Sequence, residues 1–447
     1  MQTVLPALDV ERIRAHFAFP ETGRVVTNNA ATTQPPRELV ELQGALVPTY
    51  ENIHRGQSAA SRLTTQRFEE SYDTVAAWVN APSRRSVALY RNTTEAINAV
   101  MYALLTELRD GDNVVTTTME HNSNFVPWYA MCREILPRFG RRVECRVARF
   151  HHATGRLDVD HLARLVDDRT KLVACTGASN FLGTKPPLDV VRAISRESGY
   201  RQPTGERGSL LLVDAAQLVP TTAVDVQALD VDFLAFSFHK LLAPFGVGVL
   251  VGKEHLLAAQ LPFLYGGDMV AEGQVAPDHV AYDDLPWRYA AGTPNILGTI
   301  VSAQVLRLIL DLVLDDGASW FGTSRPLPFT AVEAAMDRVR RHTRALTQRA
   351  LDGLRTVEGL RIYGPPEAAE RSPLVAFTVA GRNPMDLATR LGELGVESRA
   401  GCHCATLAHQ DLGLNPPASC RLSFALYTSE EDVDRAVDAV RTVVRRP

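Results

Sequence analysis

Residues 232–240 read DFLAFSFHK, an apolar strand whose polar end carries Ser237, His239 and Lys240. In open α/β sheets, ligands bind at the carboxyl ends of the strands, so these side chains are expected beside a binding crevice. A lysine that is desolvated there loses its proton more easily and can form a Schiff base with a carbonyl cofactor. The simpler alternative is an exposed loop charge, and the neighbours of Lys240 in the fold decide between the two.

The sequence on both sides of this strand, from about Ser86 to Gly252, alternates short apolar runs with longer amphipathic runs. This alternation is typical of βαβ units. Several apolar runs are hydrophobic on both faces, as expected when helices cover both sides of a largely parallel sheet. The pattern therefore predicts an α/β fold with a mostly parallel seven-stranded sheet. The expected strands are 86–90, 113–118, 143–150, 171–179, 209–216, 232–238 and 247–252, and the expected helices are 94–108, 158–166 and 189–198.

The pattern changes after residues 292–295, GTPN, and the remaining chain predicts a smaller α+β domain. A Gly-, Pro- and Ser-rich stretch at 317–330 is typical of a loop. The closing helix begins with a serine cap backed by acids. We predict an N-terminal segment (1–25) that packs with the small domain, a large domain (26–295) and a small domain (296–447). The expected helices of this part are 296–314, 332–357, 385–395 and 429–446, and the expected strands are 360–364, 374–381 and 420–427.

The composition makes several classes of protein poor candidates. The chain of 447 residues has 45% hydrophobic residues and a formal net charge of −4, which is ordinary for a globular protein. The chain has no excess of basic residues, so nucleic acid or a membrane surface is not expected as the main partner. The first residues lack a secretory signal, and the apolar runs look too short and interrupted for a membrane span. The six cysteines favour a reducing compartment over a disulfide scaffold, so the cytoplasm is the expected location.

Polar side chains also follow the strands upstream of Lys240. Asp214 ends the strand LLLVD and is followed by Gln217. A carboxylate there can pair with a pyridinium nitrogen and keep the ring an electron sink, although capping of the next helix is the simpler alternative. Thr93 and Thr94 begin a helix, where free N–H groups and hydroxyls can hold a phosphate or merely cap the helix.

Two further strand ends carry His121 and Asn180. The histidine can stack on an aromatic cofactor, and the amide can reach a ring oxygen. Either residue alone is more simply a structural one. The order and spacing of the whole set resembles the class V aminotransferase family, the fold-type I enzymes that use pyridoxal 5′-phosphate (PLP). The likeness runs from Val26 to Val443 and includes the blocks NNAATTQPP, FSFHK and AGTPN.

Within that family the chain is most similar to group II cysteine desulfurases and selenocysteine lyases. The blocks that carry this likeness are IHRG (53–56), MEHNSNFVPW (119–128), VDAAQ (213–217), PWRYAAGTPN (286–295) and RAGCHC (399–404). The resemblance implies that Lys240 holds PLP, that Asp214 pairs with the ring nitrogen and that His121 stacks above the ring as a catalytic residue. It also implies a homodimer with shared active sites, because Thr293 matches a residue that reaches the phosphate of the neighbouring subunit. The other implied cofactor ligands are Thr93, Thr94, Asn180, Gln217, Ser237 and His239.

The resemblance also places the substrate. Arg421 matches the arginine that grips the substrate carboxylate, a task that suits a bidentate guanidinium. Cys404 stands at the position of the nucleophilic cysteine, where a thiolate can attack the substrate sulfur. The implied reaction converts L-cysteine to L-alanine and leaves a persulfide on Cys404, which a small acceptor protein would take. The further residues implied for the substrate pocket are Arg399, Arg55, His54 and Asn180.

Alternatives stay open at this point. The scaffold also suits a selenocysteine lyase, a C–S lyase or a β-eliminase, or a protein that has kept the fold without its chemistry. Cys402 either relays sulfur or only fills its position. A zinc site made by Cys402, Cys404, His403 and His409 has poor spacing, and no metal is expected.

The chain departs from the family pattern at several points. These are Asn28, Ser58, Phe238, the stretch YRQPTGERG (200–208) and the loop around Trp320. None falls on a residue implied to bind the cofactor. We expect these departures to alter the shape of the pocket, and with it the choice of substrate.

Overall fold

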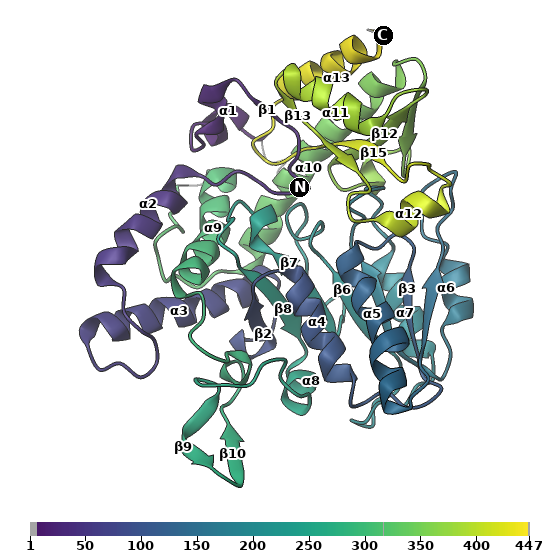
Figure 1. The fold of residues 1–447 in the computed structure, drawn as a ribbon. Helices are drawn as coiled ribbons and strands as arrows, with labels where there is room; N and C mark the ends of the chain where they lie inside the picture. Colours follow the sequence, from purple (N-terminus) through teal and green to yellow (C-terminus); the bar gives the residue numbers. More distant parts are fainter. Residues whose placement is uncertain (1–6, 316, 446–447) are drawn as a thin grey trace, which may run out of the picture.

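The computed structural model describes residues 7–315 and 317–445 and is built around a seven-stranded sheet (Figure 1). The strand order is β2-β8-β7-β6-β5-β3-β4, and the run from β7 to β4 is parallel. β8 pairs antiparallel with both of its neighbours. All seven predicted strands are present, so the predicted α/β fold class is confirmed. Their bounds are β2 (Val87–Tyr90), β3 (Asn113–Thr117), β4 (Glu144–Ala148), β5 (Thr170–Thr176), β6 (Leu210–Asp214), β7 (Phe233–Ser237) and β8 (Gly248–Gly252).

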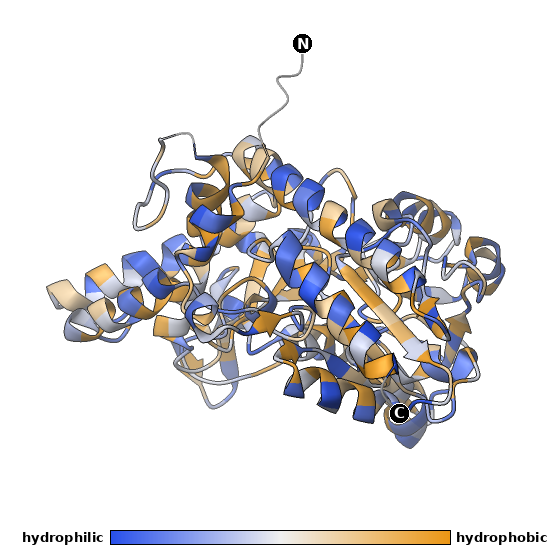
Figure 2. Cartoon of the chain, turned by 90° about the horizontal axis from the view of Figure 1, so that it is seen from above, coloured by the Kyte–Doolittle hydropathy of each residue, from blue (hydrophilic) through white to orange (hydrophobic). Residues whose placement is uncertain are grey.

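Helices cover both faces of this sheet, which explains why its central strands are apolar throughout. Leu210 and Leu212 of β6 pack with α4 (Thr93–Leu104) and α5 (Val126–Ala130). Leu211 and Val213 of the same strand face the other layer, which contains α3 (Ala59–Trp78), α6 (Val159–Leu165) and α7 (Leu188–Glu197). Figure 2 shows the result, with hydrophobic strands at the centre and helices that carry hydrophilic residues around them.

A second, antiparallel sheet has the order β11-β12-β15-β14. Residues of α10, α11 and α13 form a separate hydrophobic core with it. Ser429 caps the closing helix as predicted, because its Oγ accepts from Asp432 N while its own N–H donates to the Asp432 carboxylate. The bounds are α10 (Phe329–Arg355), β11 (Leu360–Tyr363), β12 (Leu374–Val379), α11 (Pro384–Glu393), β14 (Arg399–Gly401), α12 (Thr406–Asp411), β15 (Ser419–Ser423) and α13 (Glu430–Arg445).

The start of the described chain contacts the C-terminal part. β1 (Val25–Val26) pairs in parallel with β13 (Val396–Glu397), and Asn28 forms a bridge to Ser423. Residues 1–6 of the predicted N-terminal segment and 446–447 of the predicted small domain lie outside the described residues. The division into three units stays a prediction.

The helix α9 (Ile296–Leu314) is the one described helix that is long and apolar enough to cross a membrane, which the short apolar runs of the sequence did not suggest. It is instead a core helix, since 83% of its most apolar window is buried. It packs against α2 (Arg37–Leu46), α3 and α10. Its charged Arg307 is satisfied inside the protein by Thr74 Oγ1 and the carbonyl of Arg325.

Several elements were not predicted. A hairpin of β9 (Val270–Ala276) and β10 (His279–Tyr282) projects from the part of the protein that holds the large sheet (Figure 1). Val275, Val280 and Tyr282 are exposed on it. α2, α3 and the short strands β13 and β14 were also missed, because their sequences lack a clear period or are too short to show one.

Candidate active site

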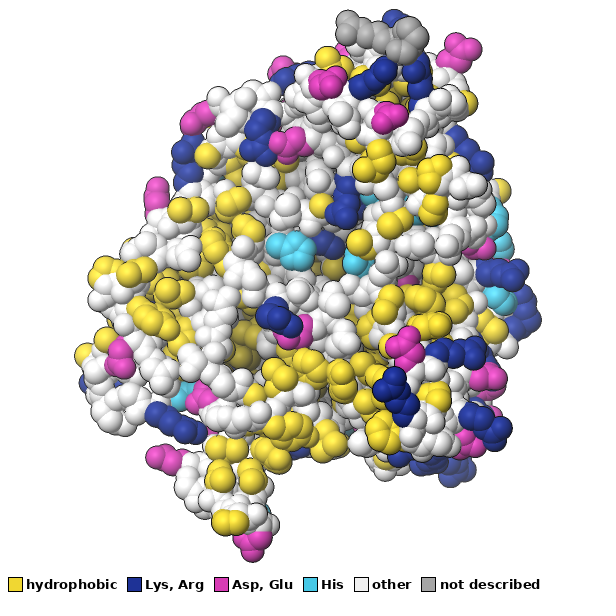
Figure 3. Space-filling model, in the orientation of Figure 1, with side chains coloured by type: hydrophobic (Ala, Val, Ile, Leu, Met, Phe, Trp, Pro, Cys, Tyr) yellow, Lys and Arg dark blue, Asp and Glu magenta, His cyan; other side chains and the backbone are white. Residues whose placement is uncertain are grey.

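A cavity of about 260 Å³ opens at the carboxyl ends of β3, β5, β6 and β7, where the two parts of the chain meet. Figure 3 shows a hollow near the middle of this face, with His and Lys or Arg side chains at its border. The cavity brings together side chains that are up to 391 positions apart in sequence, from Ala30 to Arg421. The predicted residues that line it are Thr93, Thr94, His121, Asn180, Asp214, Gln217, Ser237, His239, Lys240, Arg399, Cys404 and Arg421.

Strand register explains how the central pair meets. Thr176 lies opposite Asp214, and Asp214 lies opposite Ala235, so the parallel strands β5, β6 and β7 end at the same edge. Lys240 follows β7 in a single turn, η7 (Phe238–Lys240), which turns it back over that edge. The Asp214 and Lys240 charges are close enough to affect each other's pKa.

Burial dominates the electrostatics of this pair. It lowers the pKa of Lys240 to about 8, with Arg421 and Arg399 acting in the same direction and the Asp214 carboxylate opposing them. Burial likewise raises the pKa of Asp214, while Lys240 lowers it. Within the described residues, no hydrogen bond is formed by Lys240 Nζ, and Asp214 accepts one, from Ala216 N at 3.0 Å. The lowered pKa gives Lys240 a larger neutral fraction near neutral pH than an exposed lysine has, and an unbonded neutral amine can react with a carbonyl group.

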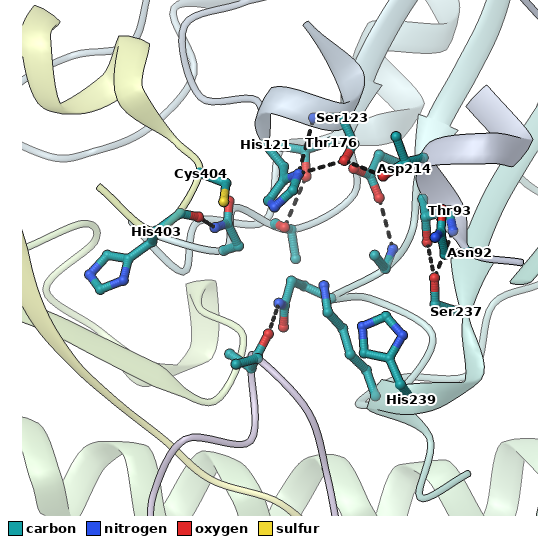
Figure 4. A pocket seen from close by; sticks show the side chains of 18 of the residues that line it. Asn92, Thr93, His121, Ser123, Thr176, Asp214, Ser237, His239, His403 and Cys404 are labelled. Carbon is teal, nitrogen blue, oxygen red and sulfur yellow. Dashed lines mark hydrogen bonds between the residues drawn. The ribbon is translucent and has the colours of Figure 1, made fainter. Parts of the chain in front are cut away.

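A cluster of hydroxyls lies at the start of α4 (Figure 4). Thr93 donates its N–H to Ser237 Oγ at 2.7 Å, and the two hydroxyls are 2.6 Å apart. Asn92 caps this helix by accepting from Glu95 N. Gly248 lets the strand approach this turn, because a Cβ there would lie 2.4 Å from the Asn92 backbone. Free helix N–H groups and hydroxyls together suit a phosphate group.

His121 is held in one tautomer. Its Nδ1 accepts the N–H of Ser123 at 3.1 Å, so a neutral ring carries its proton on Nε2. Burial lowers the pKa of His121 to about 3, and the charges of Lys240, Arg399 and Arg421 lower it further. His121 is therefore an uncharged aromatic ring at neutral pH.

Arg421 presents an unused fork of donors. Its side chain is 1% exposed, and Nη1 donates to the Asn180 carbonyl at 2.6 Å. Nε and Nη2 are buried without a partner among the described groups. Two adjacent N–H groups of a buried guanidinium match the two oxygens of a carboxylate. Burial, aided by Arg399, lowers the pKa of Arg421 to about 9, as expected for a cation that lacks its counterion.

Register in the small sheet places the second arginine, because Arg399 of β14 lies directly opposite Arg421 of β15. The turn after β14 carries Cys404 into the same cavity. Both His403 (φ 51°) and Cys404 (φ 56°) have left-handed backbone conformations, which cost energy for residues with a side chain.

Hydrogen bonds from residues that follow β3 and β5 of the large sheet hold this strained turn. Asn122 N donates to the Cys404 carbonyl at 2.6 Å, and Asn180 Nδ2 donates to the His403 carbonyl at 2.6 Å. Figure 4 shows His403 and Cys404 on the opposite side of the cavity from Thr93 and Ser237. The thiol therefore faces the hydroxyl cluster across the space in which a ligand would lie.

Behind the turn, His403, Ser419 and His409 form a buried relay. His409 Nδ1 lies 2.9 Å from the Ala405 carbonyl, which only accepts, so that nitrogen carries the proton. His409 Nε2 then accepts from Ser419 Oγ at 3.0 Å, and Ser419 Oγ accepts from His403 Nε2 at 3.0 Å. This order leaves His403 Nδ1 as a bare lone pair, and it is indeed a buried atom without a described partner. Burial lowers the pKa of both histidines, so both are neutral.

Three predicted residues lie away from this cavity. His54 Nδ1 is 3.3 Å from the Asp268 carboxylate, and its ring lies 4.7 Å from that of Trp287. Arg55 donates to the Val270 carbonyl at 3.5 Å, and Thr293 is exposed. Within a single chain, none of the three lines the cavity.

The departures from the family pattern also lie outside the cavity lining. Ser58 caps α3 by accepting from Ser61 N at 3.0 Å. Phe238 is buried and packs near Phe236, with ring centroids 5.9 Å apart. Trp320 lies under Arg325, 4.2 Å from its guanidinium carbon. Their effect on the choice of substrate stays a prediction.

Glu120 is a member of the site region that sequence reasoning missed. Its carboxylate, 1% exposed, accepts from Thr117 Oγ1 at 2.7 Å, Thr176 N at 2.9 Å and Asn124 Nδ2 at 2.6 Å. Burial raises its pKa to about 8, and the nearby Asp214 charge adds to the rise. An acid just after the strand and next to His121 was the available signal. Ser123, Thr176 and His403 also line the cavity and were not predicted to do so.

The donor and acceptor set fits PLP. The unbonded amine of Lys240, the buried carboxylate of Asp214 and the hydroxyl cluster suit the aldehyde, the ring nitrogen and the phosphate of that cofactor, respectively. Asn180 Oδ1 is a further buried atom that lacks a described partner. No group of three or more His, Cys, Asp or Glu residues suited to a metal ion occurs within the ranges that the structure describes.

Comparison with known proteins identifies the family of this fold. Residues 25–318 and 315–436 match the model of the family described as aminotransferase class-V. The chain belongs to this family. A relative from Halobacterium salinarum, named probable cysteine desulfurase, is 37% identical over 97% of this chain and 96% of its own length.

Two solved structures are similar over nearly the whole chain. The cysteine desulfurase CsdA from Escherichia coli, in an S-sulfonic acid form, is 31% identical with a TM-score of 0.81 and covers 98% of each chain. The apo cysteine desulfurase from Thermococcus onnurineus is 28% identical with a TM-score of 0.84 and covers 99% of each chain. The predicted family relationship is confirmed.

Proposed function

We propose that this protein is a PLP-dependent cysteine desulfurase that converts L-cysteine to L-alanine and transfers the sulfur to Cys404. The observation that carries this proposal is the position of Cys404 in the same cavity as Lys240, Asp214 and the unpaired fork of Arg421. Relatives of at least 33% identity that bear the name cysteine desulfurase support it.

The chain's own residues supply binding and proton transfer. Arg421 binds the substrate carboxylate through Nε and Nη2, and Arg399 adds positive charge from the opposite strand. Lys240 would hold the cofactor, and its amine, when free, would move a proton from the substrate Cα. When bound, PLP supplies an electron sink that weakens the bonds at Cα and Cβ. Asp214 keeps the ring nitrogen protonated, and the neutral His121 covers the ring.

Sulfur transfer needs the thiolate of Cys404. Its Sγ attacks the substrate sulfur, so an S–S bond forms while the substrate Cβ–S bond breaks. The electron pair of the broken bond stays with the substrate carbon, which takes up a proton. L-alanine leaves, and Cys404 carries a persulfide.

Replacing Cys404 tests this assignment. Cys404→Ala should abolish alanine formation from cysteine, because no thiolate remains to take the sulfur. Selenocysteine turnover should largely survive, because elimination of selenium needs no attacking thiol. The measurement is alanine, pyruvate and sulfide released from cysteine and selenocysteine.

Cys402→Ala is the matched control, since Cys402 lies two residues away and does not line the cavity. Full cysteine turnover by Cys404→Ala would refute the sulfur-acceptor role. Pyruvate in place of alanine in the parent protein would instead indicate a β-eliminase.

We also propose a homodimer in which Thr293, Arg55 and His54 complete the site of the partner. The support is that these residues lie outside the cavity of their own chain and that Thr293 is exposed. Mixing inactive Lys240→Ala with weakened Arg55→Ala should restore activity, because one site of each mixed dimer has all native residues. Strictly additive residual activity would argue against shared sites.

The sulfur acceptor and the compartment are part of the same proposal. A persulfide on the half-buried Cys404 would pass to a small acceptor protein whose own thiol enters the cavity. All six cysteines are free thiols, which supports work in a reducing compartment such as the cytoplasm.

A further inference from the structure

A second cavity lies at the seam between the large and small domains, outside the active site. Its volume is about 20 Å³, on the same measure that gives about 260 Å³ for the active-site cavity, so only a compact ligand fits. Lys185, Arg340, Arg344 and Arg371 line it, together with threonine hydroxyls and small apolar residues. No carboxylate is present in this lining, as far as the structure describes the chain. Four cations around one small space repel each other unless a negative charge joins them.

Backbone pairing fixes two of these cations side by side. Thr184 forms an antiparallel bridge with Arg371. On either side of it, Lys185 N donates to the Glu370 carbonyl at 3.0 Å and Ser372 N donates to the Gly183 carbonyl at 2.7 Å. This bridge joins the loop after β5 to the segment before β12. The backbones of Lys185 and Arg371 are therefore held side by side in one wall of the cavity.

Arg371 is a fixed charge without a carboxylate partner. It is 3% exposed, and its nitrogens donate only to carbonyls, those of Tyr363 at 2.6 Å, Pro365 and Leu374. Burial lowers its pKa to about 9. The carbonyls accept the hydrogen bonds of Arg371 but do not neutralise its charge.

Lys185 and Arg344 have donors to spare. The only hydrogen bond of Lys185 Nζ within the described chain is a long one, 3.4 Å to Thr222 Oγ1. Burial and the charge of Arg340 lower the pKa of Lys185 to about 8. Arg344 makes no hydrogen bond or ion pair with any residue that the structure describes, whereas Arg340 is paired with Asp337 at 2.5 Å.

The hydroxyls in the cavity are acceptors and not free donors. Thr343 Oγ1 donates to the Val339 carbonyl at 2.9 Å, and Thr347 Oγ1 donates to the Thr343 carbonyl at 2.7 Å. A ligand must therefore be recognised by the cations. This requirement selects a compact ligand with several negative oxygens over a sugar or an amine.

We propose that Lys185, Arg340, Arg344 and Arg371 form a binding site for a small multivalent oxyanion such as phosphate or sulfate. The walls come from both domains, because Lys185 belongs to the large sheet's loops while Arg340 and Arg344 belong to α10. The bound ion therefore ties the two domains together. This role does not depend on the sulfur chemistry at Cys404.

The test is thermal unfolding of the cofactor-loaded protein with increasing phosphate or sulfate, titrated separately at constant ionic strength. The loaded form is used so that the hydroxyl cluster at Thr93 is occupied. We expect a saturable rise of the unfolding temperature, with the half-saturating concentration increased at least about tenfold in Lys185→Gln and in Arg344→Gln. Arg341→Gln removes the same charge from α10 outside the cavity and should leave the response unchanged.

An equal response in Lys185→Gln and the parent would overturn the proposal, as would a response that follows ionic strength alone. A second measurement is independent of stability. Crystals of the loaded protein soaked in selenate should show anomalous scattering between Lys185 and Arg344. A soak with no signal there would also overturn the proposal.

Discussion

The two sheets contribute to the cavity in different ways. In the large sheet, parallel strands end at one edge, so Asp214 and Lys240 meet although they follow different strands. In the small sheet, antiparallel pairing sets Arg399 against Arg421 and positions the Cys404 turn. The large sheet thus holds the groups that would bind and activate the cofactor. The small sheet holds the groups that would bind the substrate and accept its sulfur.

Activation of the cofactor and handling of the substrate are therefore expected to be separable by mutation. Changes at the edge of the large sheet should affect every reaction that the cofactor supports. Changes in the small sheet should affect the identity of the substrate or the fate of its sulfur.

Lys240→Ala should have the largest effect. Loss of the amine removes both the attachment of PLP and the proton transfer, so turnover of cysteine and of selenocysteine should fall at least about 10³-fold. Visible absorbance of the purified protein should also fall, and steady-state kinetics measures the loss. Retention of selenocysteine turnover alone would contradict the assignment of Lys240 to chemistry common to both substrates.

Arg421→Lys should have the next largest effect, and this residue lies in the small sheet. A lysine keeps the charge but loses the buried fork, so kcat/KM should fall about 10- to 150-fold, mainly through KM. Arg399→Lys is the matched control, and it should lose less because Arg399 is more exposed than Arg421. Equal losses for the two variants would refute the special role of the unpaired donors.

Ser419→Ala should destabilise the small-sheet side. It leaves His409 Nε2 and His403 Nε2 without partners, which should lower the free energy of unfolding by about 1–3 kcal/mol. Denaturant unfolding measures this. Ser302→Ala is the control, since Ser302 is equally buried and its hydroxyl has no partner among the described groups. If both variants lose the same stability, the relay contributes nothing of its own.

The smallest expected effect is a shift along the pH axis. Lys240 must lose its proton to react, so capture of added PLP by cofactor-free protein should speed up as the pH rises through the lysine pKa of about 8. The Asp214 carboxylate raises that pKa, and Asp214→Asn should therefore move the midpoint to lower pH. Absorbance recorded at a series of pH values gives both midpoints. A shift to higher pH would show that another charge controls the lysine.

Sequence reasoning reached most of the large-sheet site for a physical reason. An apolar strand that ends in one polar residue is visible in the sequence, and parallel topology then brings such ends together. This was sufficient to group Asp214 and Lys240, and the resemblance to the family extended the group to His121 and Asn180.

The rest depends on contacts that no local pattern records. The opposition of Arg399 and Arg421 follows from register between strands about twenty positions apart. Glu120 can be recognised as part of the site region only from its hydrogen bonds with Thr176 and Asn124 in the folded protein. The relay through Ser419 needs two histidines from different elements. The roles proposed for Thr293 and Arg55 would require a second chain.

Several hydrogen bonds join the two halves of the site, and one of them runs from the Asn122 amide to the Cys404 carbonyl. Asn122 is the immediate neighbour of His121, so this bond links the ring that would cover PLP to the thiol that would take the sulfur. Any outward swing of the thiol turn toward an acceptor must break this link or pull the histidine with it. Delivery of sulfur and movement of the His121 ring would then occur together.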